Sequence, residues 1–134
     1  MSQLVILALL FSGVSQAQSP HDRWKSVETE HFRFHYPEAA EDWALQGADH
    51  MESIRERVIA EVGWAPPKKM DIVIRDPMST ANGSALPLQG APRMEFWSTP
   101  PDAASVIGHY RTWGELLLTH EFAHQAHLLR TARN

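Results

Sequence analysis

One stretch of fourteen residues constrains this chain more than any other. Residues 116–129 read Leu-Leu-Leu-Thr-His-Glu-Phe-Ala-His-Gln-Ala-His-Leu-Leu. They contain neither glycine nor proline and therefore predict a helix of about four turns. In such a helix His120 and His124 lie about 40° apart around the axis and about 6 Å apart along it. Both imidazoles can therefore reach one ion from the same helix face.

The pattern His-Glu-x-x-His at 120–124 suits a zinc ion. Zinc takes neutral imidazole nitrogens as ligands and keeps a position open for water when it is catalytic. Glu121 is badly placed to be a third ligand on the same helix, but it can accept a proton from a water molecule that zinc activates. The alternative is a buried amphipathic helix with two surface histidines and a solvated glutamate. The apolar flanks favour a buried metal helix; they are Leu117, Leu118, Phe122, Ala123 and Ala126.

The N-terminus predicts export. Residues 4–11 are almost all apolar, and small residues at Ser15 and Ala17 fit cleavage after Ala17. We interpret residues 1–17 as a signal peptide, 18–26 as a linker, and the protein as secreted or periplasmic; a buried N-terminal strand or helix is the alternative. The chain has no cysteine, so its stability must come from packing or from metal.

Charge and length exclude several classes of protein. The formal net charge of −4 argues against a nucleic-acid partner. No segment after residue 17 is long and apolar enough to cross a membrane, so no membrane partner is expected once the signal is removed. About 117 residues remain, enough for one small core.

The rest of the chain alternates between strand and helix patterns. Residues 31–36 alternate in polarity as a half-buried strand does, which puts His31 and His35 on the polar face. Residues 38–62 carry apolar side chains at helical spacing, and Gly63 ends that helix. Residues 70–76 predict an inner strand covered by helices, and 77–92 a loop with a turn near Asn82-Gly83.

The two remaining elements complete the prediction. Residues 93–99 predict a third strand, which Pro100-Pro101 favours at a sheet edge. Thr112 and Glu115 can form a capping box for the final helix, which would run to about Arg130. We therefore expect an α+β fold, with a small mixed sheet, a long N-terminal helix and a buried His-Glu-x-x-His helix.

This order resembles the first half of a gluzincin-type zinc peptidase, the thermolysin-like group. More specifically, it is similar to the peptidase-MA-like domain of secreted bacterial proteins in which a TolB-like β-propeller follows. The resemblance runs from about residue 24 to 129. The segments that carry it are 28–37 (Glu-Thr-Glu-His-Phe-Arg-Phe-His-Tyr-Pro), 81–83 (Ala-Asn-Gly), 99–102 (Thr-Pro-Pro-Asp) and 113–127.

The resemblance implies zinc-dependent hydrolysis of a peptide or protein substrate by a domain at residues 27–134. His120 and His124 would be zinc ligands, and Glu121 would be the general base. An edge strand beside the cleft pairs with substrate in such enzymes. Here the resemblance assigns that role to Met94, Glu95, Phe96, Trp97 and Ser98.

A third zinc ligand is missing from the pattern. In gluzincins it is a glutamate on a later helix, but no Asp or Glu follows Glu121. His127 lies about 10 Å along the helix from His120, too far to close the site, and Arg130 stands where the metzincin pattern needs histidine. We therefore expect a truncated domain with weak zinc affinity and no useful peptidase activity, whose glutamate and propeller lie downstream.

Two other classes stay open. A non-catalytic secreted scaffold or binding module would keep the helix without the metal, using His120 and His124 for packing and hydrogen bonds. A small exported protein that sequesters metal would use the eight histidines of the chain, although these are scattered rather than clustered in a tract.

Overall fold

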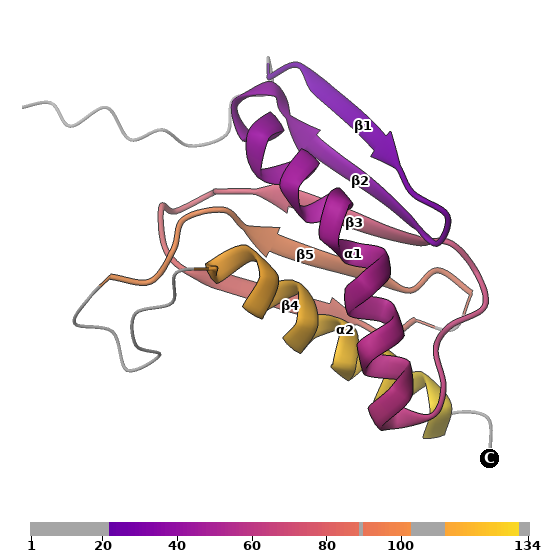
Figure 1. Ribbon diagram of the computed structural model, residues 1–134. Coiled ribbons are helices and arrows are strands. Elements are labelled where there is room, and N and C mark those ends of the chain that lie inside the picture. The colour runs from indigo at the N-terminus through magenta and orange to yellow at the C-terminus, as the bar shows by residue number, and fades with distance from the viewer. Residues whose placement is uncertain (1–21, 89, 103–111, 132–134) are drawn as a thin grey trace, which may run out of the picture.

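The computed structural model describes residues 22–88, 90–102 and 112–131, which fold into one mixed sheet with two long helices on the same face (Figure 1). The predicted signal peptide, residues 1–17, lies outside the described residues. The elements in chain order are β1 (Trp24–Glu28), β2 (Phe32–Pro37), a 3-10 helix η1 (Glu38–Ala40), α1 (Glu41–Val62), β3 (Met70–Arg75), β4 (Asn82–Leu86), β5 (Arg93–Trp97) and α2 (Trp113–Thr131). The expected α+β fold is confirmed.

The five strands of the described sheet lie in the order β1-β2-β3-β5-β4. β2, β3 and β5 are parallel, whereas β1 and β4 run antiparallel to their neighbours at the two edges. Helix α1 connects the parallel strands β2 and β3, as such a crossover requires. Every second residue of the central strands faces the helices and is buried: Phe32, Phe34, Tyr36, Met70, Ile72, Ile74, Met94 and Phe96.

Helix α1 occupies the predicted range, with its first turn wound as a 3-10 helix. Its buried residues recur at spacings of three and four, so one stripe faces the sheet; they are Ala44, Gly47, Met51, Ile54 and Val58. Gly63 ends the helix with φ of 77°, a left-handed conformation that favours glycine. Its N–H donates to the carbonyl of Ile59 at 2.7 Å.

Helix α2 begins directly after Thr112, the predicted cap, whose carbonyl accepts the N–H of Leu116 at 3.0 Å. Phe122 is 1% exposed and packs edge-on against Phe32 of β2, with ring centroids 5.4 Å apart. Gln125 is also buried and donates to the carbonyl of Arg93 at 2.6 Å. These contacts fix α2 on the sheet and determine which of its faces remains outside.

The face of the sheet away from the helices is polar in the described residues. Arg33 lies between Glu28 at 2.7 Å and Asp71 at 3.4 Å, and Arg75 pairs with Glu95. Hydrogen bonds from Lys69 and then Arg33 lower the pKa of Glu28 from 4.5 to about 2. The prediction that helices cover both faces of residues 70–76 is therefore wrong; β3 is an inner strand with one covered face, and Val73 is half-buried on the other.

Two further predictions need correction. Residues 24–28 form strand β1, so the sheet starts inside the segment predicted to be a linker. Residues 82–86 form strand β4 inside the predicted loop. Both are edge strands. In β4, pairing with β5 outweighs the weak intrinsic strand preference of Asn82, Gly83 and Ser84.

Candidate metal centre

His120 and His124 project from the same exposed face of α2. Their Nε2 atoms lie 3.0 Å apart, and their rings are nearly perpendicular, with centroids 4.6 Å apart. Both side chains are exposed because the opposite side of α2 is packed against the sheet and α1. The structure thus brings together the two histidines that the sequence assigned to one ion.

The separation of the two nitrogens fits two ligands of one zinc ion. Zinc–nitrogen bonds of about 2.0–2.1 Å at a tetrahedral angle put the nitrogens about 3.3–3.4 Å apart. The observed 3.0 Å differs by a few tenths of an ångström, which a small rotation of either exposed side chain removes. The same pair can instead share a hydrogen bond if one nitrogen carries a proton and the other does not.

Glu121 lies beside the pair and is unusual for a charged residue. Its side chain is only 7% exposed. None of the residues at 22–88, 90–102 and 112–131 donates a hydrogen bond to its carboxylate. The carboxylate oxygens still reach the surface, because the fully buried side-chain atoms without a partner belong to other residues. A carboxyl residue that is mostly buried while its oxygens keep access to solvent, beside two possible metal ligands, is a candidate for a functional role.

The part of the chain that the structure describes holds no group of three or more possible metal ligands. His127 is exposed on α2. His31 contacts Glu52 at 2.8 Å, and His35 lies between Ser26 at 2.9 Å and Asp71 at 3.1 Å. The polar contacts of His31 and His35 confirm the prediction that both histidines lie on the polar face of residues 31–36. His109 lies outside the described residues.

The contact with His31 explains how the turn between β1 and β2 is fixed to α1. Glu52 accepts hydrogen bonds from the Thr29 hydroxyl at 2.5 Å and from the His31 backbone at 2.8 Å. Partial burial raises the pKa of Glu52, but the hydrogen bonds from Thr29 and His31 outweigh it, so the net shift is downward. His31 therefore has a structural role.

The prediction that residues 93–99 form an edge strand is wrong. Met94 and Phe96 are fully buried, and β5 is paired on both sides, by β3 and by β4. Ser98 follows the strand and donates its N–H to the carbonyl of Arg75 at 3.2 Å. Both sides of this backbone are occupied, so the segment formed by Met94, Glu95, Phe96, Trp97 and Ser98 cannot pair with a peptide while the sheet stays intact.

The edge beside α2 is β4 instead. A Cβ built on Gly83 would lie 2.8 Å from Leu117 Cδ1, so glycine lets α2 pack directly on this strand. Leu117 is one helical turn from both His120 and Glu121. The sequence signal for β4 was the alternation of a run of five residues, in which the small Gly83 and Ala85 fall on one side. The pair Asn82-Gly83 obscured this signal, because it is typical of a turn.

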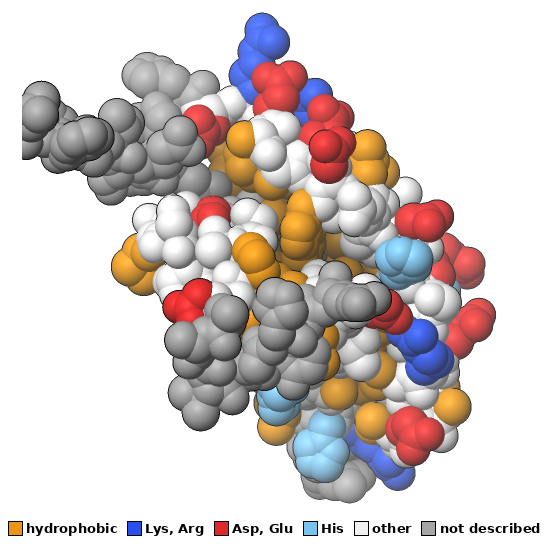
Figure 2. Space-filling view, turned by 60° about the vertical axis from the view of Figure 1, so that its left-hand side comes forward, with side chains coloured by type: hydrophobic (Ala, Val, Ile, Leu, Met, Phe, Trp, Pro, Cys, Tyr) orange, Lys and Arg blue, Asp and Glu red, His pale blue; other side chains and the backbone are white. Residues whose placement is uncertain are grey.

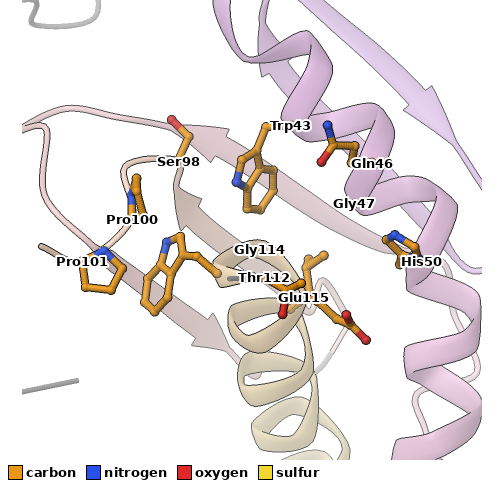
Figure 3. Close-up of a pocket in the computed structure, with 12 residues that line it drawn as sticks. Trp43, Gln46, Gly47, His50, Ser98, Pro100, Pro101, Thr112, Gly114 and Glu115 are labelled. Carbon is orange, nitrogen blue, oxygen red and sulfur yellow. The ribbon is translucent and has the colours of Figure 1, made fainter. Parts of the chain in front are cut away.

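A cavity of about 420 Å³ lies between α1, the start of α2 and the segment after β5. Figure 3 shows Trp43 of α1 directed toward Gly114, with Pro100 and Pro101 on the far side. A Cβ on Gly114 would be 3.2 Å from the Trp43 ring. The lining includes neither His120 nor His124. Because the cavity combines residues 43–50 of α1 with residues 98–101 and 112–118, which follow them by about fifty residues or more, local patterns gave no signal for it.

Figure 2 shows histidine side chains reaching the surface beside apolar ones on one face of the molecule.

Among the described residues, no helix has the length and apolar character that crossing a bilayer would require. No protein-family model, curated protein or solved structure matches the chain.

Proposed function

We propose that this chain carries part of the catalytic centre of a zinc-dependent peptidase, with His120 and His124 as zinc ligands and Glu121 as general base. The observation that supports this most is the nitrogen pair 3.0 Å apart on an exposed helix face, with a mostly buried carboxylate next to it. The mixed sheet with this helix packed across it agrees with the resemblance to the thermolysin-like group.

The chemistry divides between the ion and the chain. When bound, zinc lowers the pKa of water and polarises a carbonyl group. Glu121 accepts the proton from the attacking water and passes it to the leaving amine. Its partial burial supports this role, because few water molecules compete for the carboxylate. The two imidazoles hold their positions because α2 is anchored through Phe122 and Gln125.

The edge strand β4 is the candidate site for an extended peptide. An edge offers unpaired backbone N–H and C=O groups, and an added strand is a common way to bind a peptide. Gly83 of β4 contacts Leu117 of α2, so a peptide on this edge would run beside the helix that carries the histidines. The proposed substrate is thus a peptide or protein segment in extended conformation.

The proposal requires a third zinc ligand from outside the described residues, because these supply two. A glutamate on a later helix, followed by a propeller, is the arrangement that the resemblance implies. Secretion or a periplasmic location belongs to the same proposal.

Zinc titration and hydrolysis of an unstructured protein such as casein test this function. We expect the wild type and Glu121→Gln to bind zinc and His124→Ala to bind much less. In a protein that supplies the third ligand, Glu121→Gln should lose hydrolysis by a factor on the order of 10² or more. Hydrolysis that survives Glu121→Gln would contradict the assignment of the base.

A non-catalytic secreted module is the second candidate, favoured by the finding that the described residues supply two ligands rather than three. The same zinc titration separates the two. Equal zinc binding by the wild type and His124→Ala supports this second class, since the pair would then serve only hydrogen bonding.

A further inference from the structure

We propose that two copies of this chain share one zinc ion, with each copy contributing His120 and His124. This inference rests on the proposed function in one respect, which is that the pair binds zinc. It names the partner that completes the site when no third ligand from the same chain is present.

The described part of one chain supplies too few ligands to close a zinc site. A closed zinc site takes four ligands in a tetrahedron, and the described residues of one chain offer two. A second copy related by a two-fold axis through the ion supplies two more of the same kind. Most closed pairs of identical chains have this symmetry, in which the same patch meets itself. The pair on each chain already has nearly the spacing of two tetrahedral ligands.

The helix face around the pair is largely uncharged. His120 and His124 are exposed, so their nitrogens can reach an ion that another chain also holds. One turn away on α2, His127 and Leu128 are exposed and Leu116 and Ala123 are half-buried, whereas Leu117 is buried against β4. Glu121 is the one carboxylate one turn from His124, and it is mostly buried. Within one turn of either histidine, this face of α2 therefore carries no exposed charged side chain that would repel a second copy.

The surface around the pair is small. The exposed part of this face is a few side chains on one helix, including Leu128 at 44% exposure. Specific protein interfaces that persist without a metal bury roughly 1,200–2,000 Å² in total. A contact of this size needs the zinc to hold it together, so pairing should depend entirely on the ion. Four nitrogens leave no position for water, so the shared ion is structural and the paired form does not hydrolyse peptides.

The test is zinc titration of the full chain, followed by sedimentation velocity. One ion per two chains predicts that the dimer peaks near about 0.5 equivalents of zinc and declines when excess zinc gives each chain its own ion. Chelation by EDTA should return all protein to monomer. His120→Ala and His124→Ala should stay monomeric at every zinc level, whereas the matched control His127→Ala should still dimerise.

The outcomes separate this inference from the proposed function. Zinc bound by the wild type as a monomer at about 0.5 equivalents of zinc, with the binding lost in His124→Ala, overturns the shared site and leaves the proposed function standing. A chain that binds no zinc overturns both. A dimer that persists in EDTA, or in zinc-loaded His120→Ala and His124→Ala, also overturns the shared site. Circular dichroism of each variant checks that these exposed substitutions leave the helices intact.

Discussion

Phe122 provides the most informative test of how α2 is anchored. Its side chain is 1% exposed and packs edge-on against Phe32, which is itself 1% exposed. Truncating a buried phenylalanine to alanine typically costs about 3–5 kcal/mol, from lost transfer free energy plus the cavity left behind. The lost aromatic pair accounts for about 0.5–1.5 kcal/mol in comparable cases. We therefore expect Phe122→Ala to cost about 3–5 kcal/mol of unfolding free energy.

Domains of this size have a total stability of about 5–15 kcal/mol. The loss should thus lower the melting temperature by at least about 12 °C, given about 4–8 °C per kcal/mol for a chain with roughly 100 ordered residues. Urea denaturation followed by circular dichroism measures it. The matched control is Leu128→Ala on the same helix, where the side chain is 44% exposed. This substitution should change the unfolding free energy by no more than about 0.5 kcal/mol. If Phe122→Ala costs less than about 1 kcal/mol, α2 does not pack on β2 as described.

Three other changes test separate parts of the fold. Lys69 and then Arg33 lower the pKa of Glu28 from 4.5 to about 2, so the stability that the Glu28 carboxylate contributes is present above about pH 4.5 and lost as the pH falls toward 2. Melting temperatures across this range should fall less steeply in Glu28→Gln than in the wild type. Gly63→Ala should cost about 1–2 kcal/mol in urea unfolding, because φ of 77° disfavours a Cβ, and a stabilised variant would argue against the left-handed cap. Gly83→Val should cost about 1–3 kcal/mol, because the added side chain meets Leu117; unchanged stability would mean that β4 does not lie under α2.

Elements with strong local signals could be predicted from the sequence. The spacing of Ala44, Met51, Ile54 and Val58 specifies which stripe of α1 is buried, and Gly63 ends the helix where its special backbone angle is needed. The His120 and His124 pair was predictable for the same reason, because a spacing of four on one helix fixes the geometry without reference to the rest of the chain.

The order of the strands could not be predicted in this way. β4 contains Asn82, Gly83 and Ser84, residues that are depleted in strands or typical of turns. It forms because β5 offers a partner along its whole length and Leu117 covers Gly83. Once β4 takes the edge, β5 is inside the sheet, so the edge position that Pro100 and Pro101 favoured for residues 93–99 is wrong. The substrate strand that the resemblance placed there moves to β4 in our proposal. Long-range pairing, rather than propensity, decides both.

The measurement that tests the central claim most directly is zinc binding by the wild-type chain beside a His120→Ala, His124→Ala double variant. Equilibrium dialysis with metal analysis gives the zinc bound per chain. The account predicts a zinc site in the wild type that the double variant lacks, with the two proteins equal in helix content. Equal zinc binding by both would show that other histidines hold the metal and would contradict the proposed centre.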